Sequence, residues 1–182
     1  MRYSRGGRGL VVVAQDSPIR DVSGLRGKLI AGPDRLALVS LVVSRWLDER
    51  GLQETRDYRL VRSVSFNTAV LTVQRGEAVA AISAPGALQQ MPAALRDSVR
   101  VLGETGDYTN LIYLASPAIS AAERARIRDL VAGFGNKTEA GKKFLEATGF
   151  GSVLAATDAD MAPLDQYVAE TRRLLRDAPK AP

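Results

Sequence analysis

The chain has 182 residues, of which 46% are hydrophobic and 25% are charged, a balance typical of one globular domain or two small lobes that excludes a disordered chain. The absence of cysteine and histidine excludes disulfides, thiol nucleophiles, imidazole bases and zinc sites built from the usual ligands. The net charge of +5 comes from basic residues interleaved with acidic ones, and only 5% of residues are aromatic, so we expect no nucleic-acid partner.

Residues 1–9 are rich in arginine and glycine and are interpreted as a flexible leader. They lack the apolar stretch of a secretory signal peptide. The longest apolar runs, Leu10–Ala14 and residues 36–43, are much shorter than the roughly 20 residues that cross a bilayer. The sequence therefore predicts no membrane span.

From Leu10 onward, short β-rich apolar runs alternate with helical patterns. Asp34 is a candidate cap for a helix over residues 35–50, and Ser65 for a helix over residues 66–75. This order indicates an α/β fold in which a mainly parallel sheet is covered by helices on both faces. Strands are predicted at residues 10–14, 28–31, 58–62, 79–83, 99–102 and 110–115.

After about Pro117 the pattern becomes wholly helical. Ser120 and Glu123 predict a capping box for a helix whose apolar face carries Ile127, Leu130, Val131 and Phe134. A second helix is predicted over residues 138–148, with Gly149 as its stop. A third begins at Pro163 and places Leu164, Tyr167, Val168, Thr171 and Leu175 on one side.

The candidate motifs for catalysis or metal binding are incomplete. Residues 133–138 resemble the end of a phosphate loop, but Asn136 replaces the glycine before Lys137, so we interpret them as a helix end followed by a new cap. Asp158 and Asp160 lack the remaining ligands of a calcium loop and are interpreted as N-capping residues. Because no serine lies three residues before a lysine, a Ser-Lys hydrolase is not indicated. We expect no enzyme, no cofactor and no metal.

Three strand-to-helix turns are the features that favour ligand binding. Residues 32–37, 63–68 and 83–86 follow predicted strands, so they gather at the carboxyl edge of the sheet, where open α/β folds bind ligands. Each turn presents backbone N–H groups and the positive end of a helix dipole, which suit a small anion. The alternative interpretation is ordinary helix capping. The candidate ligand-binding residues are Leu36, Ala37, Ser65, Asn67, Thr68 and Ser83.

The order of segments resembles the phosphate, phosphite and phosphonate periplasmic binding proteins of ABC transporters, from about Leu10 to Leu175. The stretches that carry the resemblance read LVVVAQDSPIRDVSGLRGKLIAGPDRLALVSLVVSRWLDERGL, VRSVSFNTAVLTVQRGEAVAAISAPGAL, NLIYLASPAIS, FLEATGFGSV and APLDQYVAETRRLL.

The resemblance implies a type II periplasmic binding fold, with two α/β lobes and the ligand held in an interlobe cleft. On this basis residues 10–106 form the ligand-binding lobe, residues 107–177 a return strand and helices of a partial second lobe, and residues 178–182 a disordered tail. It also implies periplasmic localisation, with the opening part of the first lobe and a signal peptide upstream of Met1.

The family's ligand motif is eroded in this sequence. A hydroxyl cluster that resembles Ser-Thr-Ser-Gly in the family is replaced by residues 37–40, which read ALVS. A Ser-His-Asp turn corresponds to Ser65, Phe66 and Asn67, which retains the hydroxyl alone. Because phosphoryl anions depend on charge-assisted hydrogen bonds, these changes favour a less charged or more apolar ligand, unless Leu38, Val39 and Phe66 are simply core.

The resulting hypothesis is a solute-binding component of an ABC importer that binds a small, phosphonate-like or phosphate-like oxyanion at helix N-termini and passes it to a permease. The alternative is a sensor or interaction module built on the same lobe and without transport. A third hypothesis is a gene fragment with an exposed stripe at Ile127, Leu130, Val131 and Phe134, prone to association.

Overall fold

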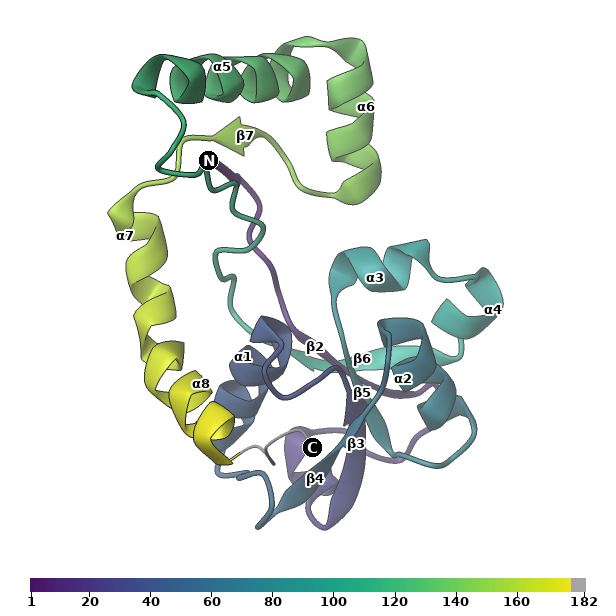
Figure 1. The fold of residues 1–182 in the computed structure, drawn as a ribbon. Helices are drawn as coiled ribbons and strands as arrows, with labels where there is room; N and C mark the ends of the chain where they lie inside the picture. Colours follow the sequence, from purple (N-terminus) through teal and green to yellow (C-terminus); the bar gives the residue numbers. More distant parts are fainter. Residues whose placement is uncertain (178–182) are drawn as a thin grey trace. The chain divides into compact units, whose positions relative to one another are not determined.

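A computed structural model describes residues 1–177 and resolves the chain into two compact units (Figure 1). Unit 1 comprises Met1–Gly7 and Asp107–Asp165, and unit 2 comprises Arg8–Gly106 and the chain from Gln166 onward. The predicted tail at residues 178–182 lies outside the described residues.

Unit 2 is built on a five-stranded sheet with the order β4-β3-β5-β2-β6. Strand β3 runs parallel to β4 and β5, whereas β2 runs antiparallel to β5 and β6. The strands are β2 Leu10–Ala14, β3 Lys28–Gly32, β4 Tyr58–Arg62, β5 Ala80–Ser83 and β6 Val99–Glu104. The helices are η1 Val22–Leu25, α1 Leu38–Asp48, α2 Phe66–Gln74, α3 Pro85–Gln90, α4 Ala93–Arg96 and α8 Asp165–Asp177, the last assigned to this unit from Gln166.

Two hydrophobic cores lie on the two faces of this sheet, as predicted for an α/β fold. One joins β2, β3 and β5 to α2 and α4 through residues such as Val12, Val70 and Leu95. The other joins the opposite sheet face to α1 and η1 through residues such as Ile30 and Leu47. Alternate residues of each strand point to opposite faces, which is why neighbouring valines of β2 are divided between the two cores.

The fold class predicted from the sequence is confirmed, with two local differences. The sheet is mixed, because β2 is antiparallel to both of its neighbours. The first helix begins at Leu38 and not at residue 35, because the Asp34 carboxylate accepts a hydrogen bond from the N–H of Leu36, 2.9 Å away, and forms a turn before the helix. Ala37, which has no capping side chain, is the residue that precedes the helix.

Unit 1 contains the two-stranded antiparallel sheet formed by β1 (Arg2–Tyr3) and β7 (Val153–Leu154), with the helices α5 (Ala121–Lys137) and α6 (Glu139–Thr148). Its small core joins Tyr3, Leu145 and Val153. The ring of Tyr3 also stacks on that of Phe150, with 4.5 Å between the ring centroids.

Two segments of unit 1 differ from the sequence-based expectation. The segment predicted as a flexible leader contains β1, because Tyr3 buries its ring in the unit 1 core and pairs with Val153. The strand predicted at residues 110–115 does not form. Only a single bridge joins Ile112 to Arg2, since both Leu111 and Leu114 are exposed and provide no buried face for a strand.

The helix ends of unit 1 follow the predicted capping chemistry. The Ser120 side chain accepts a hydrogen bond from the N–H of Glu123, and the Glu123 carboxylate accepts one from the N–H of Ser120, which confirms the capping box. Gly149 ends α6 in the left-handed conformation at φ 72°, which glycine adopts without strain.

The predicted apolar stripe of α5 is only partly covered within unit 1. Val131 packs against the small core, whereas Ile127, Leu130 and Phe134 are exposed by 45%, 62% and 51%. Most of this stripe therefore contributes nothing to the unit 1 core.

The last segment contains one helical element more than the sequence predicts. A short helix α7 (Asp158–Met161) and a 3-10 turn η2 (Ala162–Leu164) precede α8. Thr157 and Asp160 form a capping box at the start of α7, so Asp160 caps the helix that comes before the predicted one. Tyr167 of α8 is buried.

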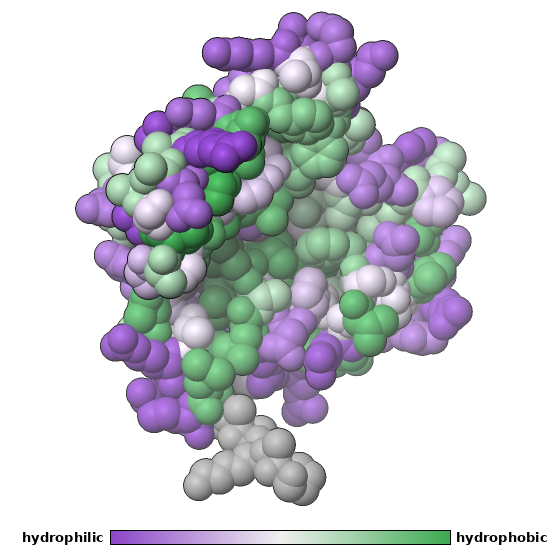
Figure 2. All heavy atoms as spheres, turned by 45° about the horizontal axis from the view of Figure 1, so that its top comes forward, coloured by the Kyte–Doolittle hydropathy of each residue, from purple (hydrophilic) through white to green (hydrophobic). Residues whose placement is uncertain are grey.

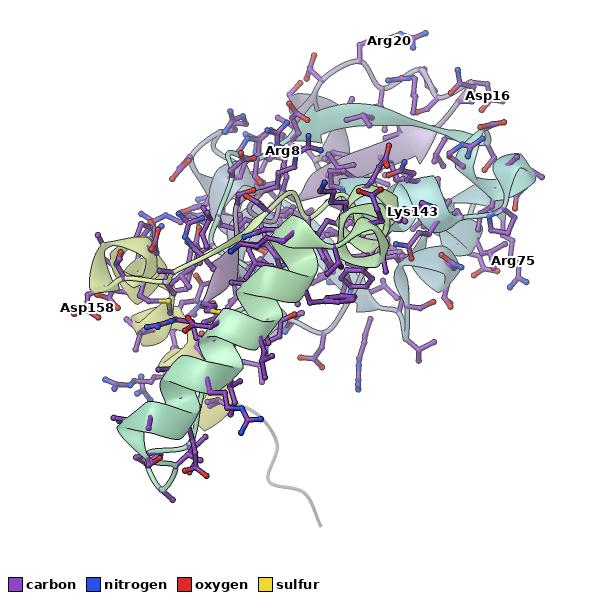
Figure 3. The ribbon with its side chains drawn as sticks, turned by 90° about the horizontal axis from the view of Figure 1, so that it is seen from above. Arg8, Asp16, Arg20, Arg75, Lys143 and Asp158 are labelled. Atoms are coloured by element: carbon purple, nitrogen blue, oxygen red, sulfur yellow. The ribbon has the colours of Figure 1, made fainter. Side chains whose placement is uncertain are left out.

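Charged side chains cover the surface of both units. Figure 3 shows Asp16, Arg20 and Arg75 of unit 2 pointing outward, and all three are exposed. On the face drawn in Figure 2, hydrophobic residues lie among hydrophilic ones. Among residues 1–177, no helix combines the length and hydropathy that crossing a membrane requires.

Burial of Tyr58, at the start of β4, makes the free energy of unfolding decrease at high pH. Burial is the main cause that raises the pKa of Tyr58 from 10.0 to about 12. Between these values the folded state holds a proton that the unfolded state has lost, so the free energy of unfolding must fall as pH rises from 10 to 12. Urea unfolding followed by the fluorescence of Trp46 should show this fall, and Tyr58→Phe should make it shallower. An equal slope in both proteins would contradict the prediction.

Candidate anion site

The ends of three strands meet at one edge of the unit 2 sheet. Gly32 of β3 pairs with Arg62 of β4, and Ala31 pairs with Ala81 of β5, so all three strands end at nearly the same level. The N–H of Ser63 donates to the carbonyl oxygen of Gly32 at 2.7 Å and joins two of the turns. We call this edge, formed by residues 32–37, 63–65 and Ser83, the strand-end edge. It brings together the three turns that the sequence identifies.

At the N-terminus of α1, the backbone N–H groups without a hydrogen-bond partner are not the ones that the sequence predicts. The N–H groups of Leu36 and Ala37 are already used, since they donate to the side chain and the carbonyl oxygen of Asp34. The interpretation that they bind a ligand is therefore corrected. The N–H groups of Leu38 and Val39 have no hydrogen-bond partner within the described residues, as expected in the first turn of a helix.

At the N-terminus of α2, Ser65 and Thr68 are occupied with one another. The Ser65 hydroxyl oxygen accepts from the N–H of Thr68 at 3.1 Å, and the two hydroxyls are hydrogen-bonded at 2.9 Å. This confirms Ser65 as the cap and uses the backbone donor of Thr68. The N–H groups of Phe66 and Asn67 have no partner within residues 1–177.

Ser83, the last residue of β5, has a buried hydroxyl that finds no partner. Its side chain is 0% exposed, and its Oγ makes no hydrogen bond among the described residues. Along β5, Ala81 packs in the core that contains α2, and alternation places Ser83 on the same sheet face. A buried hydroxyl without a hydrogen-bond partner is costly, which makes the Ser83 Oγ a candidate ligand-binding atom at this edge.

Each arginine near the edge has a carboxylate partner. Arg62 Nε lies 3.3 Å from an oxygen of Asp34. The guanidinium of Arg35 lies 2.7 Å from Glu54. Glu104 lies at this edge too, because its strand partner Leu10 also pairs with Ser83. Arg8 contacts Glu104 at 3.3 Å. The positive and negative side chains at the edge therefore balance.

The apolar residues that replace the family's ligand motif have different surroundings. Val39 is buried, and Phe66 packs against both cores of unit 2, so these two are core residues. By contrast, Val64 is 90% exposed and Leu36 is 38% exposed. The exposed apolar side chains of the edge therefore lie in the two turns and not in the helices.

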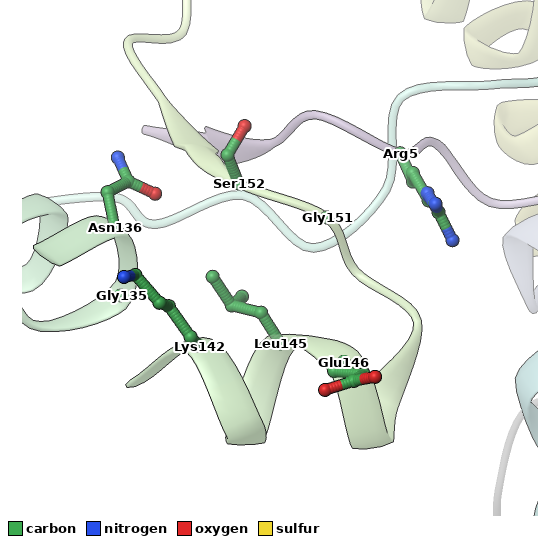
Figure 4. Close-up of a pocket in the computed structure, with 8 residues that line it drawn as sticks. All are labelled: Arg5, Gly135, Asn136, Lys142, Leu145, Glu146, Gly151 and Ser152. Carbon is green, nitrogen blue, oxygen red and sulfur yellow. The ribbon is translucent and has the colours of Figure 1, made fainter. Parts of the chain in front are cut away.

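A cavity of about 390 Å³ lies in unit 1, apart from the predicted residues (Figure 4). Its lining includes Arg5, Asn136, Lys142 and Glu146. The side-chain amide of Asn136 is held by β7, because it donates to the carbonyl oxygen of Val153 and accepts from the N–H of the same residue. Lys142 contacts Glu139 at 3.3 Å. These polar groups serve the packing of α5, α6 and β7.

The described part of the chain contains no group of three or more histidine, cysteine, aspartate or glutamate side chains that could hold a metal ion. Apart from the arginines that contact carboxylates, the donors at the strand-end edge are neutral. Backbone N–H groups from two helix N-termini and one buried hydroxyl are the groups that can donate to a ligand.

A family model described as "ABC transporter, phosphonate, periplasmic substrate-binding protein" matches residues 2–161. A search of curated proteins gives no match.

Solved structures of the same fold include proteins from three bacteria. XAC2383 from Xanthomonas citri, bound to chloride, has a TM-score of 0.74 and 15% identity, and the match covers 97% of this chain and 70% of that one. PhnD1 from Prochlorococcus marinus, in complex with methylphosphonate, has a TM-score of 0.75 and 13% identity, covering 97% and 71%. The aliphatic sulphonate binding protein SsuA from Escherichia coli has a TM-score of 0.65 and 20% identity, covering 98% and 69%.

Proposed function

This chain belongs to the family of periplasmic substrate-binding proteins of phosphonate ABC transporters, and from that premise we propose that it binds a small oxyanion at the strand-end edge of unit 2 and passes it to an ABC permease. The family resemblance predicted from the sequence is confirmed, as is the prediction of a binding protein in place of an enzyme. Members of the family are periplasmic, and we extend that location to this chain.

The observation that carries the proposal is the unpartnered hydroxyl of Ser83. It is fully buried at the end of β5 and has no hydrogen-bond partner within the described residues. The neighbouring strand ends lead into α1 and α2, whose first N–H groups at Leu38, Val39, Phe66 and Asn67 are also unused. An anion is the ligand that satisfies all of these donors together, and both helix dipoles favour negative charge at this place.

The six predicted residues have different parts in this proposal. Ser83 contributes its hydroxyl and Asn67 its backbone N–H. Ser65 and Thr68 shape the first turn of α2 through their mutual hydrogen bonds. Leu36 and Ala37 belong to the turn that precedes α1, and their N–H groups are used within it. Leu38, Val39 and Phe66 contribute backbone donors that the sequence-based list lacks.

The ligand classes to test come from proteins of the same fold. PhnD1 is described in complex with methylphosphonate, and SsuA is described as an aliphatic sulphonate binding protein. Both ligands present three oxygen atoms around a phosphorus or sulfur atom, which matches a site made of several N–H and O–H donors. No observation in the described residues favours the alternative of a sensor or interaction module.

The experiment is a thermal melt followed through Trp46, which is the only tryptophan and lies in α1, with and without phosphate, phosphite, alkylphosphonates and alkylsulfonates. A ligand present at about 100 times its dissociation constant stabilises the folded state by about 2.7 kcal/mol, which raises the melting temperature by several degrees. A cooperative melt that none of these anions shifts would contradict the proposal.

Ser83→Ala distinguishes a ligand-binding hydroxyl from a structural one. Because the Oγ makes no hydrogen bond in the free protein, we expect the melting temperature without ligand to stay the same or rise. The affinity for the bound anion should fall about tenfold or more, since a hydrogen bond to a charged group contributes about 1.5–3 kcal/mol.

The matched control for this variant is Ser23→Ala in η1, which precedes β3 at the other end of the strand. It should leave the affinity unchanged. Loss of stability without loss of affinity in Ser83→Ala would assign Ser83 a structural role and remove it from the site.

A further inference from the structure

We infer that the ligand of the strand-end edge is a singly charged organic oxyanion with an apolar substituent, of the alkylsulfonate class, and not a doubly charged phosphonate. This inference rests on the proposed function and specifies its substrate class. It is carried by the charge balance of the edge and by the place of its exposed apolar side chains.

Apart from the arginines, which have carboxylate partners, the donors at the edge are neutral. They are the N–H groups of the first turns of α1 and α2 and the hydroxyl of Ser83, which is 0% exposed and has no partner among the described residues. Hydrogen bonds from neutral donors to an anion are strengthened by the charge of one partner only. Neutral donors can replace the hydration of a monoanion better than that of a dianion, because the free-energy cost of removing an ion from water rises steeply with its charge.

The cationic side chains are neutralised by neighbouring carboxylates. Arg62 contacts Asp34, which lies in the turn before α1 and itself accepts a hydrogen bond from the N–H of Leu36. Arg35 and Arg8 contact Glu54 and Glu104. Among the described residues, a second negative charge on the ligand therefore finds no arginine at the edge that lacks a carboxylate partner.

The two turns of the edge place apolar surface beside these donors. Val64 immediately precedes the capping residue Ser65 and is 90% exposed, and Leu36 lies two residues before α1 and is 38% exposed. Contact with an alkyl group would remove this surface from water, at about 25 cal/mol for each Å² buried. An inorganic anion offers no such group, so an organic substituent is favoured.

The two ligand classes differ in charge at neutral pH. An alkylsulfonate carries one negative charge throughout the working range, whereas an alkylphosphonate has a second acidic proton, so it changes from a monoanion at acidic pH to a dianion at alkaline pH. The chain contains no histidine, and histidine is the residue whose side chain ordinarily titrates between about pH 5 and pH 8. The charged groups at the edge are Asp34, Glu54, Glu104 and their three arginine partners. A change of affinity for methylphosphonate that methanesulfonate does not share therefore reports the charge of the ligand.

The first test is isothermal titration of the full chain with methanesulfonate, butanesulfonate and methylphosphonate at about pH 8 and about pH 5.5, on either side of the second phosphoryl pKa. We expect butanesulfonate to bind more tightly than methanesulfonate, with the same affinity at both pH values. Methylphosphonate should bind more weakly than butanesulfonate at the higher pH, where it is mainly a dianion, and should gain affinity at the lower pH, where it is a monoanion.

The outcomes separate the two proposals. Tighter binding of methylphosphonate at the higher pH than of either sulfonate overturns the substrate class and leaves the anion site standing. Equal affinity for the two sulfonates overturns the role of the apolar turns. Binding of none of the three, and of neither phosphate nor phosphite, by folded protein overturns the proposed function itself, and the inference with it.

The second test removes the carboxylate that balances Arg62. Asp34→Asn retains a side-chain oxygen that can accept from the N–H of Leu36, so the turn before α1 is expected to persist. At the higher pH the affinity for methylphosphonate should rise about tenfold, because Arg62 becomes available to a dianion, whereas the affinity for methanesulfonate should change much less.

The matched control is Asp97→Asn, which removes the carboxylate of another exposed pair, Arg96 Nε to Asp97 at 3.0 Å. Asp97 lies just before β6, whose first residue Val99 pairs with Ala14 at the opposite end of β2 from Leu10. This variant should change neither affinity. An equal rise for both ligands in Asp34→Asn, or no rise for methylphosphonate, would contradict the role of charge balance in selection.

Discussion

Replacing Leu47 with alanine is expected to destabilise unit 2 by about 2–5 kcal/mol, the usual cost of truncating a large buried side chain. Leu47 lies near the end of α1, is 0% exposed and packs in the core shared by α1, η1 and the sheet. Its neighbours Ile30 and Val43 are equally buried, so the space left by the truncation cannot fill without moving the sheet or the helix. Urea unfolding followed by Trp46 fluorescence measures the loss.

The matched control is Leu175→Ala in α8, where the same side chain is 57% exposed. Exposed substitutions away from special features usually change stability by no more than about 0.5 kcal/mol. If both variants lost the same stability, the assignment of Leu47 to the core would be wrong. The assignment would also be wrong if Leu47→Ala unfolded at the same urea concentration as the unmodified chain.

Gly141→Ala is expected to destabilise unit 1, by about 1–3 kcal/mol, although alanine is the better helix former. Gly141 lies in the first turn of α6, where its N–H donates to the Thr138 hydroxyl oxygen at 3.0 Å. A Cβ at this position would collide with the backbone carbonyl group of Phe134 in α5. Since a backbone group cannot rotate away as a side chain can, the junction between the two helices must open.

Gly133→Ala is the control, since it makes the same change within α5 at a place where a Cβ would meet no atom within 4 Å. It should stabilise the chain by about 0.5–1 kcal/mol, the ordinary advantage of alanine over glycine in a helix. Urea unfolding followed by circular dichroism should therefore show shifts of opposite sign for the two variants. A gain of stability in Gly141→Ala would show that the backbones of α5 and α6 are not in contact at this point.

The features that could be predicted from the sequence are those that depend on neighbouring residues. Ser65 and Ser120 cap helices as predicted, because a hydroxyl that begins a helical run can reach an N–H group three residues later. All five predicted strands of unit 2 appear within two residues of their expected ends, since their apolar runs pack in one sheet that is covered on both faces. The type II periplasmic binding fold came from the order of these segments.

The features that could not be predicted depend on partners distant in the sequence. Nothing in residues 1–9 shows that Tyr3 will pair with Val153, because the two lie at opposite ends of unit 1's sequence. The antiparallel direction of β2 is likewise a property of the whole sheet, and the run Leu10–Ala14 would look the same in a parallel one.

The candidate site combines both situations. The three turns were predictable, because they follow strands and begin helices. Which N–H groups are left without a partner was not predictable. It depends on the turn in which Leu36 and Ala37 donate to the side chain and the carbonyl oxygen of Asp34. Ser83 was predictable as a residue, whereas the absence of a partner for its hydroxyl within the described residues becomes visible only after β2, β5 and α2 are packed around it.

The pairing of β1 with β7 has a consequence for the order in which the sheets of the two units form during synthesis. All five strands of the unit 2 sheet have been made once Glu104 is synthesised, so that sheet can assemble while the rest of the chain is still being added. Strand β1 is made before any of them, yet its partner Val153–Leu154 is among the last segments to appear. Domains generally fold as units during synthesis, and a sheet cannot form before its last strand has been made. Unit 1 therefore completes its sheet after unit 2, although it contains the first residues of the chain.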